Sequence, residues 1–216
     1  MSVKVIIFDF DGTLADTLDA VVSITNRLAG EYGYKPTTPE ELAQIRRLSS
    51  REIIKQSGIS IFRMPFLLKR VRDYLRNDIQ QLNPIEGIKE ALTQLKKQGN
   101  SLGILTSNSE ENVRVFLEKH GMQDLFSFIY SEPTLFSKHK ILKKFMRRNS
   151  LTPEEVIYVG DETRDIEASK RIPIKVIAVS WGFNSGEALA KQSPDFLIQK
   201  PSELIKVMRS LQQNVS

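Results

Sequence analysis

The sequence predicts an α/β protein with a Rossmann-like, doubly wound parallel sheet and a small all-helical cap inserted after the first strand. Short apolar runs alternate with helical patterns along most of the 216 residues. This alternation is typical of a parallel sheet with helices on both faces. Between residues 17 and 83 only helical patterns occur, which indicates an insertion. We therefore expect a core domain of residues 1–16 and 84–216 and a cap domain of residues 17–83.

The strands of the core are predicted from runs with the continuous apolar character of strands buried on both faces. They are residues 3–10, 101–105, 128–130, 156–159, 175–179 and 196–198. Core helices are predicted at 85–98 and 110–120, where apolar residues recur at helical spacing and a glycine follows. Thr152 and Pro153, followed by two glutamates, have the pattern of a capping box and predict a further helix start.

The inserted segment is predicted to contain helices at residues 17–31, 39–47, 50–57 and 64–81. Thr38 and Pro39, again followed by two glutamates, give the second of these helices a capping signal. The segment holds 11 Lys and Arg against 7 Asp and Glu, so most of the formal charge of +5 lies here. An excess of positive charge favours an anionic partner.

Composition excludes several classes of protein. The absence of cysteine excludes a disulfide scaffold, a Cys-ligated zinc site, an iron–sulfur cluster and thiol catalysis. No apolar run approaches the roughly 20 residues that span a bilayer. The first residues lack the basic, apolar and small-residue pattern of a secretory signal, so we expect a cytoplasmic protein. A pI of about 9.3 would suit nucleic acid, but no nucleic-acid-binding motif is present.

Carboxylates follow two of the predicted strands. Asp9 and Asp11 end the first run and precede Gly12, and strand alternation would point both side chains to one side. Two like charges held so close need a counter-cation, and Mg²⁺ prefers such oxygen ligands together with substrate phosphate. Asp161 follows the fourth run, and Asp165 would lie about one helical turn further on. Asp161 could be a further ligand of the metal, and Asp165 could lie next to the site without binding the metal directly.

Anion-binding groups follow the second run and precede a later helix. Thr106, Ser107 and Asn108 offer hydroxyl groups and backbone N–H groups in front of a helix, as an anion cradle does. Lys138 lies at a predicted helix start, where a cation is unfavourable for the helix dipole. This misfit indicates a task elsewhere, such as neutralising a phosphate. Taken singly, these segments also fit structural roles as turns, helix caps or solvated side chains.

In combination and in this order, the four segments resemble the motifs of the haloacid-dehalogenase superfamily of phosphohydrolases. The resemblance covers the sheet domain from about residue 3 to residue 183, and the helical insertion looks like the cap of the phosphoglycolate phosphatase-like branch. It implies that Asp9 attacks phosphorus to form an aspartyl-phosphate and that Asp11 acts as the acid and base. It further implies Mg²⁺ as cofactor, held by Asp9, the Asp11 backbone carbonyl and Asp161.

The same resemblance implies that Thr106 and Lys138 bind the phosphoryl oxygens, with backbone N–H groups from the regions of Gly12, Ser107 and Asn108. Asp165 would orient Lys138 or a metal-bound water. In the cap the resemblance is architectural only. There, Arg46, Arg47 and Arg51 surround a break between two predicted helices, and we expect this turn to face the catalytic pocket.

The predicted function is therefore Mg²⁺-dependent hydrolysis of a small anionic phosphorylated metabolite, with phosphoglycolate, sugar phosphates, nucleotides and pyrophosphate open as substrates. A phosphomutase of the same fold, a non-hydrolytic phosphoacceptor domain, a dehalogenase and a nucleic-acid-binding module are the alternatives. Asp11 argues against the dehalogenase, and the helical cap argues against the phosphoacceptor. A monomer and a homodimer both remain open.

Overall fold

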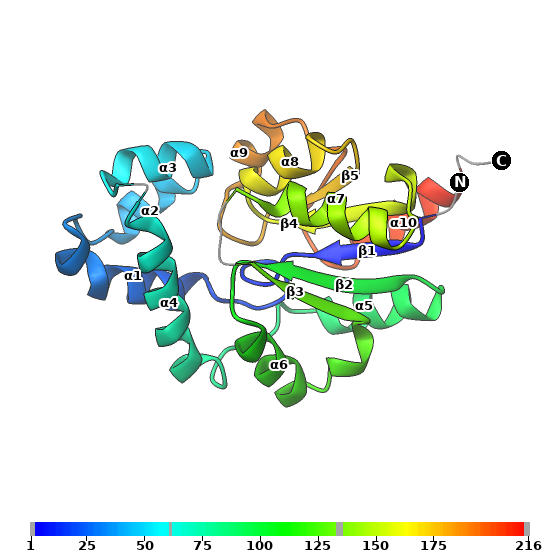
Figure 1. Cartoon of the computed structure of the whole chain (residues 1–216), viewed down its shortest axis with the longest axis horizontal. Helices are drawn as coiled ribbons and strands as arrows, with labels where there is room; N and C mark the ends of the chain where they lie inside the picture. Colours follow the sequence, from blue (N-terminus) through cyan, green and yellow to red (C-terminus); the bar gives the residue numbers. More distant parts are fainter. Residues whose placement is uncertain (1–2, 61, 133–135, 214–216) are drawn as a thin grey trace.

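The computed structural model describes residues 3–60, 62–132 and 136–213. Residues 1 and 216, which bound the predicted core domain, lie outside the described residues. Its centre is a sheet in which all neighbouring strands are parallel, in the order β3-β2-β1-β4-β5-β6 (Figure 1). The strands are β1 (Val5–Phe8), β2 (Ser101–Thr106), β3 (Phe128–Ser131), β4 (Val156–Gly160), β5 (Lys175–Val179) and β6 (Phe196–Ile198). The predicted α/β fold is confirmed.

Helices cover both faces of this sheet. Alternate strand residues point to opposite faces, and because both sets are apolar here, each face packs against helices. In β1, Ile6 and Phe8 belong to one buried cluster and Val5 and Ile7 to the other. The first cluster is covered by α5 (Ile88–Lys97), α6 (Glu110–Lys119) and α10 (Glu203–Gln213). The second is covered by α7 (Lys138–Arg148), α8 (Thr163–Lys170) and α9 (Gly186–Lys191). The strands are thus apolar on both faces, as the sequence pattern predicts.

Four helices between β1 and α5 lie beyond the carboxyl ends of the strands (Figure 1). They are α1 (Leu18–Tyr32), α2 (Pro39–Ile45), α3 (Ser50–Ser57) and α4 (Met64–Asp78). Helices α1 and α4 share an apolar cluster distinct from the two sheet clusters, to which Ile24 and Leu75 belong. The chain leaves and re-enters the sheet unit side by side, since Ala15 pairs with Pro84. We keep the name cap for these helices; its boundaries at residues 17 and 83 remain a prediction.

Local sequence signals explain most element ends. The Thr38 capping box is present at the start of α2. The similar box at Thr152 starts only one 3-10 turn, Pro153–Glu155, because the β-branched run of β4 begins at Val156. Helix α5 starts at Ile88 rather than at residue 85, because Gly87 has a left-handed φ of 78° that ends the preceding turn.

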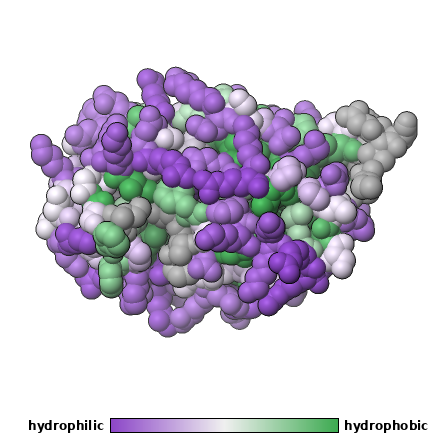
Figure 2. All heavy atoms as spheres, turned by 45° about the horizontal axis from the view of Figure 1, so that its top comes forward, coloured by the Kyte–Doolittle hydropathy of each residue, from purple (hydrophilic) through white to green (hydrophobic). Residues whose placement is uncertain are grey.

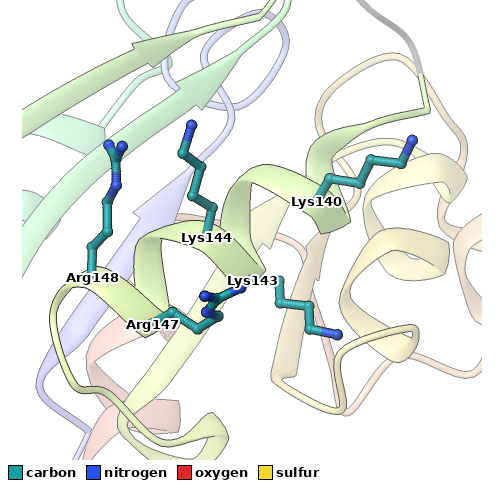
Figure 3. A pocket seen from close by; sticks show the side chains of 5 residues that line it. All are labelled: Lys140, Lys143, Lys144, Arg147 and Arg148. Carbon is teal, nitrogen blue, oxygen red and sulfur yellow. The ribbon is translucent and has the colours of Figure 1, made fainter.

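Hydrophilic residues dominate the face of the molecule that Figure 2 shows. On α7, five basic side chains line a shallow hollow of about 480 Å³ (Figure 3); they are Lys140, Lys143, Lys144, Arg147 and Arg148. The described residues that line this hollow are all basic, so it lacks the carboxylates that a metal site would need. Within the described residues, no helix is both long and apolar enough to cross a membrane.

The strand order determines where a ligand can bind. Strands β1 and β4 are neighbours at the centre of the sheet, and the helices that precede the next strands, α5 and α8, cover opposite faces. In open α/β sheets such a reversal leaves a crevice at the carboxyl ends of the two strands. The residues that directly follow β1 and β4 therefore lie at the expected ligand-binding edge.

Candidate active site

Lys138 joins two carboxylates at the centre of this edge. Asp9 directly follows β1, and its N–H donates to the Val159 carbonyl at 2.8 Å, which continues the strand pairing. Lys138, the first residue of α7, places its Nζ 2.5 Å from Asp9 Oδ2 and 2.6 Å from Asp165 Oδ1. All three side chains are buried. Burial alone would lower the pKa of Lys138, but the charges of Asp165 and Asp9 raise it. The unfavourable helix position of this cation is therefore explained by its two partners.

Asp161, the residue after β4, is held by two hydrogen-bond donors. The Thr13 hydroxyl donates to Oδ1 at 2.6 Å, and the Phe183 N–H donates to Oδ2 at 2.7 Å. The chain approaches this carboxylate so closely that side chains are excluded. A Cβ on Gly12 would lie 2.4 Å from Oδ2, and one on Gly182 would lie 2.2 Å from it. Glycine at both positions is therefore needed for the observed placement of Asp161.

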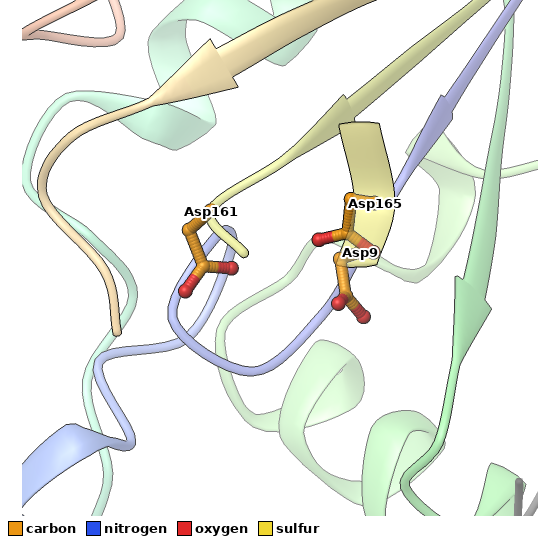
Figure 4. A group of neighbouring side chains, drawn as sticks. All are labelled: Asp9, Asp161 and Asp165. Atoms are coloured by element: carbon orange, nitrogen blue, oxygen red, sulfur yellow. The ribbon is translucent and has the colours of Figure 1, made fainter. Parts of the chain in front are cut away.

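The carboxylates of Asp9, Asp161 and Asp165 form one buried group (Figure 4), with an oxygen of each within 4.8 Å of the others. Burial, together with the charges of Glu162 and Asp9, raises the pKa of Asp161 well above its ordinary value. Burial raises the pKa of Asp165 to about 6, although Lys138 opposes this shift. Three acids with one lysine leave an excess of negative charge, and their oxygen atoms suit a hard divalent cation. The group can therefore bind a metal ion.

Asp11 lies beside this group with a different set of contacts. The expectation that Asp9 and Asp11 point to the same side as alternate strand residues does not apply, because β1 ends at Phe8. Both oxygens of its carboxylate accept from Asn108 Nδ2, each at 3.1 Å. Burial, and then the charge of Asp9, raises the pKa of Asp11 to about 7. This carboxyl group can therefore hold a proton or release it near neutral pH. Its predicted role as a metal ligand through the backbone carbonyl remains a prediction.

The predicted phosphate cradle lies at the end of β2. Thr106 is buried, and its Oγ1 accepts from the Asn108 N–H at 2.9 Å, which leaves its own O–H to donate. The Ser107 carbonyl accepts from Arg72 of α4 at 3.5 Å, so the cap covers this end of the site. Asn108 links the cradle to Asp11 through its side chain. The structure thus brings Asn108 into contact with Asp11, and Thr106 into contact with the backbone of Asn108.

The three cap arginines have different contacts. Arg46 donates to the carbonyl oxygens of Gly182 at 2.8 Å and of Phe183 at 3.2 Å. Arg51 pairs with Glu167 at 2.8 Å, and its guanidinium lies 4.6 Å from the centre of the Phe136 ring. Arg47 is exposed. The turn that carries them packs on the core beside the site, but a contact with substrate remains a prediction for all three.

Several residues of the site lack a signal that our sequence analysis used. Gly182 and Phe183 act through backbone atoms, which almost every residue type offers. Asn184 is buried and joins the cap to α8 through its side chain. Partly exposed Glu162 pairs with buried Arg164, next to Asp161 and Asp165 in the chain. The one available signal is position, since residues 182–184 follow β5 as Asp161 follows β4.

The family follows from the sequence match. The model of the haloacid dehalogenase-like hydrolase family matches residues 6–179. This range includes all the site residues named above except those that follow β5. The chain belongs to this family. The structure places Asp9 and Asp161 directly after β1 and β4, Thr106 at the end of β2 and Lys138 at the start of α7, which are the elements where the sequence analysis expects them. Their roles remain predictions.

Particular relatives narrow the class to phosphohydrolases. A phosphoglycolate phosphatase of Synechococcus elongatus is 39% identical over 208 residues, covering 96% of this chain and 98% of the relative. The pyrophosphatase PpaX of Bacillus cereus is 24% identical over 218 residues, covering 99% and 100%. The structure of a predicted phosphatase from Clostridium acetobutylicum superimposes with a TM-score of 0.82 at 18% identity, covering 97% and 100%; this likeness shows the fold. The protein is an enzyme, a phosphohydrolase of this family.

Gly182→Ala should prevent metal binding without unfolding the protein. The added Cβ would meet Asp161 Oδ2 at 2.2 Å and the Gly12 carbonyl oxygen at 2.4 Å, so the carboxylate must move. In thermal melts, MgCl₂ at 100 times its dissociation constant stabilises a native protein by about 2.7 kcal/mol, and we expect most of this stabilisation to disappear. The control is Gly30→Ala, since no atom lies within 4 Å of that Cβ. If MgCl₂ stabilised Gly182→Ala as much as the wild-type protein, the close contact of Gly182 with Asp161 would not be needed for metal binding.

Proposed function

We propose that the protein is a Mg²⁺-dependent phosphatase that hydrolyses a small phosphate monoester through an aspartyl-phosphate on Asp9. The observation that carries the proposal is the position of the Asp9 carboxylate. It lies at the carboxyl end of β1, bound to Lys138 and within 4.8 Å of carboxylate oxygens of Asp161 and Asp165. A nucleophile, a charge-neutralising cation and a metal-binding group thus occupy one place.

In the first step, a carboxylate oxygen of Asp9 forms a bond to phosphorus while the bond from phosphorus to the leaving oxygen breaks. Asp11 gives its proton to that oxygen, so the alcohol leaves neutral. A pKa raised to about 7 by burial supports this role, because it allows the carboxyl group to hold the proton near neutral pH. Lys138 and the Thr106 hydroxyl would bind the phosphoryl oxygens as their charge is redistributed.

In the second step, a water oxygen forms a bond to phosphorus and the bond from phosphorus to Asp9 breaks. Asp11 takes the proton of the water, and inorganic phosphate is released with Asp9 restored. Dividing the displacement in two lets one carboxyl group act first as acid and then as base. Asn108 would keep the Asp11 side chain in place, since it donates to both carboxylate oxygens.

Asp9, Asp161 and the Asp11 carbonyl would hold the Mg²⁺ ion, and Asp165 would orient Lys138. When bound, the ion would neutralise negative charge on the phosphoryl group and on the carboxylates. The oxygen-only donor set and its excess negative charge support Mg²⁺ over softer metals. Asp9 is 1% exposed, which also indicates that substrate and ion are enclosed when the cap packs on the core.

We propose 2-phosphoglycolate as the substrate. The support is the 39% identity to the phosphoglycolate phosphatase of Synechococcus elongatus over nearly the full length of both chains. A small ester that carries a carboxylate as well as a phosphate also suits a site covered by a cap with an excess of basic residues. Pyrophosphate is the second candidate, because the more distant relative from Bacillus cereus is named a pyrophosphatase.

Asp11→Asn should separate the two chemical steps. We expect turnover of an alkyl phosphate to fall about 10²–10⁴-fold, since neither the acid nor the base remains. p-Nitrophenyl phosphate has a good leaving group and needs less acid catalysis. The variant should therefore release one p-nitrophenol per enzyme in a burst and then stop, which stopped-flow absorbance would record. Steady hydrolysis of both substrates at the wild-type rate would contradict the assignment of Asp11.

A substrate panel tests the choice of ester. With MgCl₂ present, we expect kcat/KM for 2-phosphoglycolate to exceed the values for pyrophosphate, glucose phosphates and mononucleotides at least tenfold, and EDTA to remove all turnover. Phosphate release measured at equal enzyme concentration provides the comparison. Faster turnover of pyrophosphate would replace the proposed substrate, and conversion of one sugar phosphate isomer into another without phosphate release would identify a phosphomutase instead.

A further inference from the structure

The loop at residues 182–185, between β5 and α9, binds Asp161 through its backbone. The Phe183 N–H donates to Asp161 Oδ2 at 2.7 Å, and the Asn184 N–H donates to the Asp161 carbonyl oxygen at 3.3 Å. Gly182 lies against the same carboxylate, with no room for a Cβ. The position of this loop therefore determines the position of the Asp161 carboxylate.

The cap turn at residues 46–50 holds the same loop from the other side. Arg46 Nη2 donates to the Gly182 carbonyl at 2.8 Å, and its Nε donates to the Phe183 carbonyl at 3.2 Å. The Ser185 N–H donates back to the Arg46 carbonyl at 2.7 Å. One cap residue thus binds the backbone of three loop residues: Gly182, Phe183 and Ser185.

Two further contacts tie the cap turn and the loop to α8. Buried Asn184 donates from Nδ2 to the Leu48 carbonyl at 2.8 Å, and its Oδ1 accepts from the Thr163 N–H at 2.9 Å. The Ser50 N–H donates to Thr163 Oγ1 at 2.8 Å. Cap turn, loop and the start of α8 therefore form one hydrogen-bonded network next to Asp161.

The decisive link is a single peptide group. The Gly182 carbonyl that accepts from Arg46 and the Phe183 N–H that donates to Asp161 belong to the same planar amide. A cation at its carbonyl end polarises this amide and strengthens the hydrogen bond at its N–H end. Arg46 consequently acts on the Asp161 carboxylate without touching it.

We propose that Arg46 is a positioning residue that couples packing of the cap turn on the core to the metal-binding geometry of Asp161, through the peptide between Gly182 and Phe183. The proposal rests on the proposed function, because the metal concerned is the Mg²⁺ ion that Asp161 would hold. With the cap turn in place, Arg46 fixes the peptide that holds the carboxylate. When the cap turn is not packed on the core, Arg46 no longer fixes the peptide between Gly182 and Phe183, and the Phe183 N–H no longer holds the Asp161 carboxylate in place. The metal site is therefore complete only under the packed cap.

The test is a titration of the whole protein with MgCl₂ alone, read from heat of binding and from fluorescence. Trp181 is the only tryptophan in the chain, and it lies next to Gly182 with its Nε1 donating to the Thr13 carbonyl at 3.2 Å. Its emission therefore reports on this loop. In Arg46→Met we expect the dissociation constant for Mg²⁺ to rise about 10–100-fold. Saturating MgCl₂ should then recover most of kcat.

Two further variants make the result specific. Arg46→Lys keeps the charge but not the two-pronged geometry, so its dissociation constant should lie between those of wild type and Arg46→Met. It also keeps the test valid if Arg46→Met does not fold. Arg70→Met removes an exposed cap arginine that pairs with Glu31 at 3.3 Å, away from the loop, and should leave the affinity for Mg²⁺ unchanged.

The outcomes separate the coupling from the proposed function. If folded Arg46→Met bound Mg²⁺ with the wild-type affinity, the coupling would be overturned. If its KM for the substrate were also raised, Arg46 would instead be a residue that contacts the substrate. Wild-type protein that hydrolyses phosphate esters but binds no Mg²⁺ would overturn both the metal dependence and the coupling. Phosphatase activity with weaker Mg²⁺ binding in the two Arg46 variants would support both.

Discussion

The buried contact between Lys138 and the carboxylates of Asp9 and Asp165 is the constraint on which the other features depend. Burying an ion costs several kcal/mol unless partners and hydrogen bonds compensate for the lost water. Here two ion pairs compensate Lys138, while Thr13 and the Phe183 N–H hold Asp161 nearby. The strand order makes this possible, because β1 and β4 end side by side between two apolar clusters. The remaining negative charge is what a divalent cation would neutralise.

The cap completes this arrangement on two sides of the site. Its turn at residues 46–50 contacts α8 and the loop after β5, and α4 contacts the β2 side through Arg72 and the Ser107 carbonyl. Part of the net positive charge of the cap is paired with acidic residues of the core. Arg51 pairs with Glu167, and Arg76 pairs with Glu111. The net charge of the cap is therefore a weaker indication of an anionic substrate than the carboxylates and Lys138 are.

Sequence analysis predicts the elements and the positions of the candidate site residues because both have local signals. Asp9, Thr106 and Asp161 each stand at the end of an apolar run, and Lys138 is found through its unfavourable place at a helix start. The contacts of Asp11 were not predictable from strand alternation, since β1 ends before it. Arg46 and Arg47 are equivalent in the sequence, and only the packing of the cap separates them. The amide of Phe183 has no signal in residue type at all.

In the proposed mechanism, Asp9 carries the phosphoryl group between the two steps. Rapid acid quenching during turnover of 2-phosphoglycolate with MgCl₂, followed by peptide mass spectrometry, tests it directly. We predict that the peptide containing Asp9 gains the mass of one phosphoryl group, and that the gain is greater in Asp11→Asn with p-nitrophenyl phosphate because the second step is slowed. Turnover with no label, or with the label on another residue, would contradict the claim and indicate direct attack by water or a different nucleophile.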